Sequence, residues 1–357
     1  MENKSIFTQL KEFINARTPC VLATVIEASG STPQVAGSSA IIGNAGLLAG
    51  TVGGGPAEYK VVTKAMAAVE SGISEIITFE LNGNLPEGSD SICGGQMTVL
   101  IDASPEKHLA SLENLTAARD HHSPGILVTL IEEKEDNAIN INRIWFQETN
   151  PSGIPDNLFP VLSPTLFQML AQPSTFGFRK LTFPGSPIGQ VSFACLETIL
   201  PPPSLVIAGA GHVGKALARI GKFLGFEVTV WDDRSEYANP VNIPDADHHY
   251  SCNFDDLLAQ IVINQYTYLV IVTRGHQFDA EVLRKWILTK PAYLGMMGSR
   301  TKIAQMRQQF LEHGWATPEE WDRVHTPIGL KIGAKTVEEI AVSIAAELVM
   351  VRNYVEK

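Results

Sequence analysis

A glycine-rich segment, Gly209-Ala-Gly-His-Val-Gly214, carries the pattern GxGxxG between an apolar run and a segment with helical periodicity. In such a turn the first glycine permits the tight bend, the second lets a phosphate approach the backbone, and the third lets the helix pack on the strand. The helix N-terminus adds N–H groups and a partial positive charge. We therefore expect a phosphate-bearing cofactor at Gly209, Gly211, His212 and Gly214; the alternative is a tight turn without a ligand.

An acid and an arginine follow at the next predicted strand end. Asp232 stands 23 residues after Gly209, and Arg234 follows it closely. At this position of a Rossmann unit an acid accepts hydrogen bonds from ribose hydroxyls, and a nearby arginine accommodates additional phosphate. Asp232 and Arg234 are predicted to hold NAD or a ligand with more phosphate, whereas a solvated turn explains Asp233 almost as well.

Two more polar loops follow predicted strand ends, at residues 273–279 and 298–302. Ligands of open parallel sheets bind beyond the carboxyl ends of the strands. We expect both loops at the same edge as the glycine-rich turn, where together they form a cleft for a polar anionic ligand. The candidate binding residues in these loops are His276, Gly298, Ser299, Arg300 and Lys302.

In the N-terminal part, Gly53, Gly54 and Gly55 precede a predicted helix from Pro56 to Gly72. Three glycines at a helix N-terminus form a backbone nest that binds anions. Glu58 in the first turn is explained equally well by its favourable interaction with the helix dipole and by a binding role beside the nest. Both interpretations of Glu58 stay open.

Cys93 lies in a polar loop before Gly94 and Gly95 and is a candidate for sulfur or cofactor handling, whereas Cys20 lies in an apolar run. Thiol reactivity requires exposure and a lowered pKa. The four cysteines contain no CxxC pair, which excludes a disulfide-dense secreted scaffold and a zinc ribbon. The histidines lack matching acidic or cysteine spacing, so no metal site is predicted.

The spacing of apolar residues predicts an α/β protein of two domains, 1–200 and 201–357, separated at Pro201-Pro-Pro203. The second domain is expected to be a Rossmann-like, doubly wound parallel sheet, and the first a mixed α/β domain. Prolines crowd residues 134–200, which we interpret as an irregular arm lying across another domain or a second subunit in a homodimer. The predicted strands cover residues 20–26, 38–42, 46–50, 76–79, 97–101, 205–208, 226–231, 268–272 and 292–296.

Composition excludes several classes of protein. The 357 residues carry a formal net charge of −11, which disfavours nucleic-acid binding. A hydrophobic content of 45% with 18% charged residues excludes a disordered chain. The uncharged stretch between Glu27 and Glu58 is too broken by glycine and proline to cross a membrane. We expect a cytoplasmic protein without a nucleic-acid or membrane partner.

Taken in order, these motifs resemble the xanthine dehydrogenase accessory factor family (XdhC/CoxI), over about residues 10–103 and 204–350. The resemblance implies a maturation chaperone for a molybdenum hydroxylase such as xanthine dehydrogenase. Such a chaperone binds molybdenum cofactor (molybdopterin), supports its sulfuration with a cysteine desulfurase and helps to insert it into the apo-enzyme. The motifs are Gly30-Ser-Thr-Pro33, Gly53-Gly-Gly55 with Glu58, Cys93-Gly-Gly95, Gly209–Gly214, Asp232-Asp-Arg234, Gly298-Ser-Arg300 with Lys302, and Pro327–Gly333.

The chain departs from the family pattern at one point. Many relatives have a cysteine directly after the paired glycines, where this sequence has Gly55-Pro56. The resemblance therefore implies no thiolate ligand for molybdenum from this loop, and Cys93 is left as the matching thiol.

Two other classes of function remain open. One is an NAD(P)-dependent oxidoreductase with His276 or Lys302 as acid or base, and the other is a nucleotide-sensing regulatory module without turnover. No Lys–His or Ser–Tyr–Lys pattern follows the glycine-rich turn. This favours a non-catalytic accessory factor over an enzyme.

Overall fold

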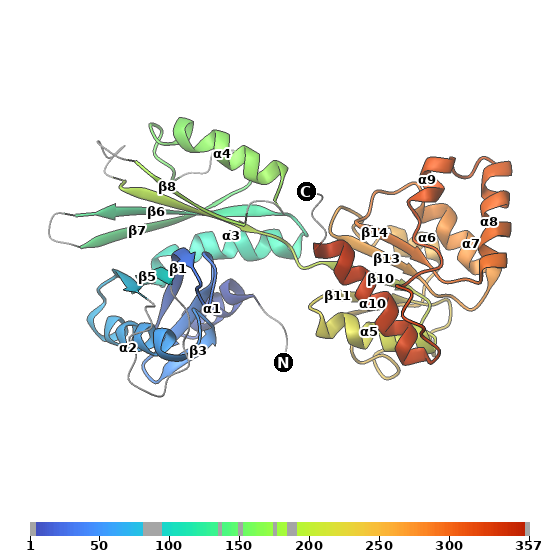
Figure 1. Cartoon of the computed structure of the whole chain (residues 1–357), viewed down its shortest axis with the longest axis horizontal. Coiled ribbons are helices and arrows are strands. Elements are labelled where there is room, and N and C mark those ends of the chain that lie inside the picture. Colours follow the sequence, from blue (N-terminus) through green and yellow to red (C-terminus); the bar gives the residue numbers. More distant parts are fainter. Residues whose placement is uncertain are drawn as a thin grey trace. The chain divides into compact units, whose positions relative to one another are not determined.

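The computed structural model describes residues 5–80, 95–134, 138–148, 153–173, 177–183 and 191–353. The chain forms two compact units, Met1–Pro201 and Pro202–Lys357 (Figure 1). Among the described residues, none of the helices combines the length and the apolarity that a membrane span needs.

The N-terminal unit begins with a five-stranded antiparallel sheet in the order β3-β2-β1-β5-β4. One face packs against α2 (Gly55–Ser71) through Val61 and Ala65. The other face packs against α1 (Ile6–Asn15) and α3 (Leu109–Asp120), which follows a 3-10 helix, η1 (Pro105–His108). The strands are β1 (Cys20–Gly30), β2 (Ser39–Gly43), β3 (Gly46–Gly50), β4 (Glu75–Glu80) and β5 (Gly95–Asp102).

A second antiparallel sheet of four strands, in the order β7-β6-β9-β8, completes this unit. Helix α4 (Phe159–Ala171) covers one face through Leu162, Leu166 and Met169. The strands are β6 (Gly125–Glu133), β7 (Ile139–Phe146), β8 (Phe178–Thr182) and β9 (Phe193–Ile199).

The predicted irregular arm over residues 134–200 is therefore wrong where the structure describes it, because three strands and a helix occupy this segment. Pro160 lies in the first turn of α4, where its missing N–H costs nothing, and Pro164 is tolerated inside the same helix. Strand β7 carries the polar residues Asn140 and Asn142 on its exposed positions. Because these residues and Arg143 interrupt its apolar residues, the strand does not stand out as a continuous apolar run.

A buried polar cluster lies between the two sheets of this unit. Arg143 donates from Nε to Asp102 Oδ2 at 3.1 Å and from Nη1 to Thr129 Oγ1 at 3.2 Å. His108 Nδ1 accepts the backbone N–H of Arg143 at 3.4 Å, and its Nε2 lies 3.6 Å from Asp102. Burial lowers the pKa of His108 to about 4 despite the neighbouring Asp102. The cluster is thus one ion pair with a neutral imidazole beside it.

The C-terminal unit is a parallel sheet in the order β12-β11-β10-β13-β14, which confirms the predicted Rossmann-like fold. Helices α5 (His212–Phe223) and α10 (Val337–Asn353) cover one face through Leu217 and Ile344. The strands are β10 (Ser204–Ala208), β11 (Glu227–Trp231), β12 (His248–Tyr250), β13 (Thr267–Ile271) and β14 (Tyr293–Met296).

The other face of this sheet packs against four helices through Trp286, Phe310 and Trp321. Met296 N donates to His325 O at 3.0 Å, so the segment around His325 runs beside β14. Helix α10 begins with a capping box, since Glu339 N donates to Thr336 Oγ1 at 3.2 Å and Thr336 N donates to Glu339 at 3.0 Å. The four helices are α6 (Phe254–Leu258), α7 (His276–Trp286), α8 (Arg300–Glu312) and α9 (Pro318–Asp322).

Candidate functional site

The glycine turn of the N-terminal unit leads directly into α2. Gly53 and Gly55 have φ values of +150° and +64°, in the region that favours glycine, and Gly54 is the residue that precedes the first turn of the helix. Thr51 Oγ1 donates to Glu58 Oε2 at 2.5 Å and accepts from Gly53 N at 3.1 Å. Glu58 is thus tied to the turn through Thr51, which favours a structural role over the open carboxylate that the sequence also allowed.

Two of the cysteines of this unit, Cys20 and Cys195, have buried side chains. Burial raises the pKa of Cys20 to about 11 and the pKa of Cys195 to about 12, so both side chains behave as inert core residues. Cys93, the candidate for sulfur or cofactor handling, lies outside the described residues.

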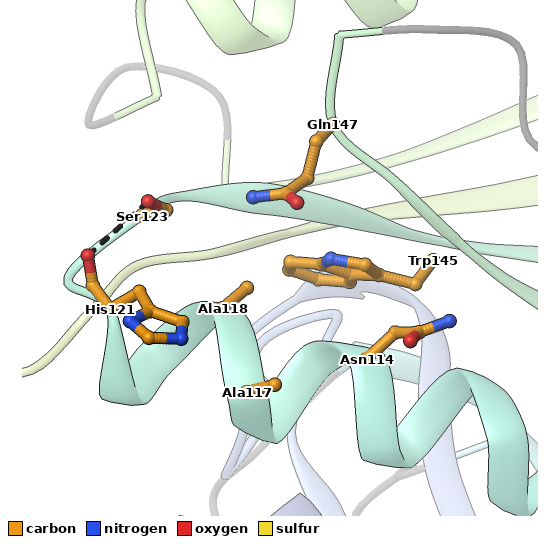
Figure 2. A pocket seen from close by; sticks show the side chains of 7 residues that line it. All are labelled: Asn114, Ala117, Ala118, His121, Ser123, Trp145 and Gln147. Atoms are coloured by element: carbon orange, nitrogen blue, oxygen red, sulfur yellow. Dashed lines mark hydrogen bonds between the residues drawn. The ribbon is translucent and has the colours of Figure 1, made fainter.

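A hollow of about 380 Å³ opens beside α3 in the same unit (Figure 2). Figure 2 shows Gln147 on one side of the Trp145 ring and the small residues Ala117 and Ala118 of α3 on the other. No motif predicted this hollow, because its residues come from a helix and a strand that the sequence pattern does not connect. It is lined by Asn114, Ala117, Ala118, His121, Ser123, Trp145 and Gln147.

The glycine-rich turn of the C-terminal unit joins β10 to α5, and two of its glycines are required by the fold itself. Gly209 has a φ of +118°, and a Cβ there would lie 2.4 Å from the carbonyl oxygen of Val272. A Cβ on Gly214 would lie 1.9 Å from the carbonyl oxygen of Gly209. Larger residues at either position would push the turn away from the strand or the helix.

Gly211, unlike Gly209 and Gly214, has room for a side chain. Its backbone is extended, with φ −73° and ψ −167°, and a Cβ there would meet nothing within 4 Å. The fold therefore does not require glycine at this position. The open side of Gly211 lies at the N-terminus of α5, where a phosphate binds in Rossmann domains. His212, the first residue of α5, is exposed.

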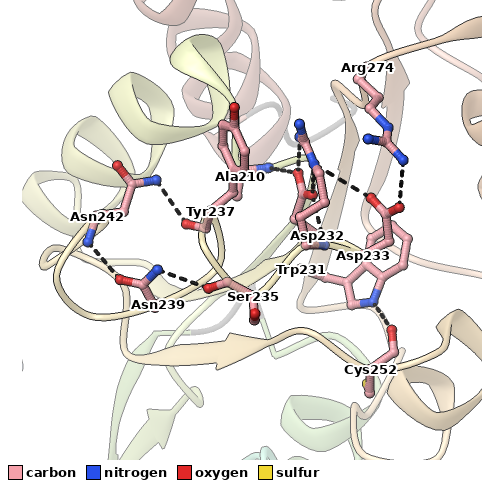
Figure 3. Close-up of polar contacts among 11 residues, drawn as sticks. Ala210, Trp231, Asp232, Asp233, Ser235, Tyr237, Asn239, Asn242, Cys252 and Arg274 are labelled. Atoms are coloured by element: carbon pink, nitrogen blue, oxygen red, sulfur yellow. Dashed lines mark hydrogen bonds and ion pairs between the residues drawn. The ribbon is translucent and has the colours of Figure 1, made fainter.

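Asp232 connects this turn to the end of β11 (Figure 3). The residue is 4% exposed, and its Oδ2 accepts the backbone N–H of Ala210 at 2.9 Å. The Arg234 guanidinium donates to both carboxylate oxygens, from Nε at 2.8 Å and from Nη2 at 3.1 Å. Burial alone would raise the pKa of Asp232, but the hydrogen bonds from Arg234 and Ala210 outweigh it and hold the pKa below its usual range.

The first turns of α7 and α8, which follow β13 and β14, contribute a second charged pair. Asp279 is 2% exposed, accepts the Thr273 hydroxyl at 2.5 Å and pairs with the ammonium group of Lys302. Ser299 caps α8, since its Oγ accepts the backbone N–H of Lys302 at 3.3 Å. The loop after β13 also reaches the loop after β11, because Arg274 Nη2 donates to Asp233 Oδ2 at 2.8 Å.

Two family models match the chain: the XdhC Rossmann domain at residues 205–348 and the XdhC and CoxI family at residues 13–80. The chain belongs to the XdhC and CoxI family. The matched segments contain the glycine turn of each unit, so the resemblance drawn from the motifs is confirmed.

This XdhC-family chain has relatives that match along nearly all of its length. It is 26% identical over 351 residues to a protein of Bacillus subtilis described as a probable xanthine dehydrogenase subunit, with 98% of each chain covered. It is 24% identical over 350 residues to the uncharacterized protein YqeB of Escherichia coli K12, and covers 46% of that protein, about half its length. A crystal structure of a xanthine dehydrogenase from Bacillus halodurans has the same fold, with a TM-score of 0.72 at 23% identity over 98% of this chain and 96% of that chain.

The predicted residues of the C-terminal unit gather at the carboxyl edge of its sheet. The turn at Gly209–Gly214 is bonded to Asp232, and Asp232 to Arg234. Gly298, Ser299 and Lys302 lie where β14 leads into α8, Arg300 is the exposed first residue of α8, and His276 is the first residue of α7. The sequence did not reveal the roles of Arg274 and Asp279 within this edge, although both stand in the segment 273–279 that was predicted to contribute to the site.

Proposed function

We propose that this XdhC-family chain is an accessory protein that matures a molybdenum hydroxylase such as xanthine dehydrogenase. In this role it binds molybdenum cofactor, supports its sulfuration together with a cysteine desulfurase, and helps to insert it into the apo-enzyme. The observation that carries the proposal is the family match to both units. The name of the Bacillus subtilis relative, which describes a component of xanthine dehydrogenase, supports the same direction.

The C-terminal unit has groups that fit the phosphate of a pterin or nucleotide cofactor. The space beside Gly211 is open, and the N-terminus of α5 supplies backbone N–H groups there. When bound, molybdenum cofactor supplies the metal centre on which the hydroxylase depends. The chain's own part is to hold the phosphate at the turn and the nucleotide end near Asp232 and Arg234, whether the nucleotide is an extension of the pterin or NAD(P).

The N-terminal unit would contribute an anion-binding turn and a thiol. Gly54 and Gly55 present backbone N–H groups at the start of α2, whereas the N–H of Gly53 is bonded to Thr51, the residue through which Glu58 fixes this turn. Cys93 is the thiol proposed to handle sulfur during sulfuration.

The test of this proposal is to identify what the protein carries. Mass spectrometry of small molecules released from gently purified full-length protein should detect a pterin, a nucleotide or both. Calorimetric titration with molybdopterin and with NAD then separates cofactor delivery from nucleotide sensing. Binding of neither class of ligand would contradict the proposed site.

A second candidate function, an NAD(P)-dependent oxidoreductase, is favoured by the Lys302–Asp279 pair. A lysine held by a buried carboxylate at the strand ends is in a position to donate a proton to a substrate. Hydride transfer followed at 340 nm with aldehyde and alcohol panels tests this candidate. Steady turnover would contradict the non-catalytic accessory role.

A homodimer and a cytoplasmic location remain proposals. The segment 134–200, whose proline content led us to expect a dimer, forms three strands and a helix of the N-terminal unit where the structure describes it. Light scattering at micromolar concentration tests the dimer directly, and a monomer would contradict it.

A further inference from the structure

The carboxylate of Asp232 is saturated by groups of its own chain. A carboxylate has about four positions at which it accepts hydrogen bonds. Oδ1 accepts Arg234 N at 3.2 Å and Arg234 Nε at 2.8 Å, while Oδ2 accepts Ala210 N at 2.9 Å and Arg234 Nη2 at 3.1 Å. The two hydroxyls of an unmodified adenosine ribose, which bind such an acid in NAD-type sites, have to displace the guanidinium first.

Arg234 is also held from a second side. Its guanidinium lies over the Tyr237 ring, 3.7 Å from the ring centre. The loop that carries Tyr237 is fixed by internal hydrogen bonds, from Tyr237 N to Arg234 O at 3.0 Å and from Asn242 Nδ2 to Tyr237 O at 2.8 Å (Figure 3). The guanidinium is therefore pre-organised, and its displacement by a ribose diol breaks a two-point ion pair and a stacking contact together.

A phosphate on the ribose, unlike the ribose hydroxyls, can bind the Arg234 guanidinium without displacing it from Asp232. The ion pair with Asp232 uses the Nε and one Nη2 hydrogen of Arg234, and a guanidinium has five N–H donors. Arg234 is partly exposed, so a phosphate can approach its outer edge while the pair with Asp232 stays intact. Arginine binds phosphate through such parallel N–H groups.

A second guanidinium lies close to the first. Arg274, from the loop after β13, pairs with Asp233 at 2.8 Å, and its side chain is 47% exposed. The Arg274 guanidinium also lies 4.9 Å from the centre of the Phe278 ring, but exposed ion pairs and exposed ring contacts each contribute little, so Arg274 can turn from Asp233 to a dianion at small cost. Two arginines from two strand ends then face the phosphate, one fixed and one movable, which offsets the repulsion from Asp233.

We propose that Arg234 and Arg274 make the nucleotide site of the C-terminal unit selective for a dinucleotide that carries a 2′-phosphate on its adenosine ribose, of the NADP type, over the unphosphorylated NAD type. The inference rests on the proposed function in one respect, that the glycine-rich turn binds a nucleotide. It specifies the class of nucleotide that binds there and assigns Arg234 as the specificity-determining residue.

The experiment is calorimetric titration of the full-length protein with NADP⁺ and with NAD⁺, for the wild type, Arg234→Gln and Arg284→Gln. Arg284 is a matched control, since it is an exposed arginine of the same unit that also stacks on an aromatic ring, that of Trp315 at 4.6 Å. The wild type and the control should bind NADP⁺ about tenfold more tightly or better, the factor expected from one charge-assisted hydrogen bond. Arg234→Gln should lose this preference by weaker NADP⁺ binding and equal or stronger NAD⁺ binding.

The titration distinguishes the role of Arg234 in selecting NADP⁺ from the existence of a nucleotide site. Equal or tighter binding of NAD⁺ by the wild type, or an unchanged ratio in Arg234→Gln, overturns the assignment of Arg234 and leaves the nucleotide site standing. Binding of neither dinucleotide overturns the assignment together with the NAD(P) part of the proposed function. Thermal unfolding of each variant checks that the unit is folded, and Arg274→Gln, whose side chain is exposed, repeats the test with a smaller expected loss of preference.

Discussion

Replacing Gly211 by valine separates what the fold requires from what a ligand requires. The backbone at Gly211 has φ −73° and ψ −167°, which valine adopts, and a Cβ there meets nothing within 4 Å. The free energy of unfolding should fall by about 1 kcal/mol or less, because valine is a poor residue at the position preceding a helix. By contrast, Gly214→Ala places a Cβ 1.9 Å from the carbonyl oxygen of Gly209, and such overpacking costs about 1–3 kcal/mol or more.

The effect of Gly211→Val on ligand binding should be much larger than its effect on stability. The valine side chain occupies the space through which a phosphate reaches the N-terminus of α5. Loss of a hydrogen bond to a charged group costs about 1.5–3 kcal/mol, or roughly one to two decades in Kd. Calorimetry with NADP⁺ and with molybdopterin measures this loss, and urea denaturation measures the stability.

The control is Gly177→Val in the N-terminal unit, another glycine whose Cβ meets nothing within 4 Å. It should change neither stability nor affinity by a comparable amount. Unchanged affinity for both ligands in Gly211→Val would refute the phosphate site. A stability loss as large as that of Gly214→Ala would refute the account of an open turn.

Three further predictions concern the N-terminal unit. Arg143→Met should destabilise the protein by about 3–5 kcal/mol in urea denaturation, because it leaves the Asp102 carboxylate buried without its partner, and a loss under about 1 kcal/mol would contradict the cluster. Because His108 has its pKa lowered to about 4, the folded state favours the neutral ring, so stability should fall as pH drops from about 6.5 towards 4; an NMR titration that puts this pKa at its ordinary value would refute the burial argument. Cys93→Ser should leave nucleotide affinity unchanged and reduce sulfur transfer to the cofactor, and full transfer by this variant would remove the thiol from the account.

The sequence predicted the C-terminal unit closely because its signals are local. Strands β10, β11, β13 and β14 are short, mainly apolar runs that are followed within two residues by a glycine or a polar residue, as at Ala208 and Gly209. Strand β12, of three residues, was missed because it is too short and polar to stand out from a loop. In the second sheet of the N-terminal unit, β6 pairs with β9, about 70 residues further along the chain, and such a non-local pairing cannot be read from residue periodicity.

In the candidate site too, the sequence predicted the positions of residues along the chain but not their side-chain contacts. Spacing placed Asp232 correctly at the end of β11, since the distance from the glycine-rich turn is set by one strand–helix–strand unit. The spacing did not show that Arg234 binds both carboxylate oxygens of Asp232, because residue periodicity does not determine side-chain rotamers. The two interpretations of Glu58 were likewise separated only by the contact with Thr51.

The accessory role is tested most directly by reconstitution of a molybdenum hydroxylase from its apo-enzyme with molybdenum cofactor and a cysteine desulfurase. The yield of active hydroxylase should rise when the wild-type chain is added, and it should rise less with folded Gly211→Val. An equal yield of active hydroxylase with and without the wild-type chain would contradict the proposed function.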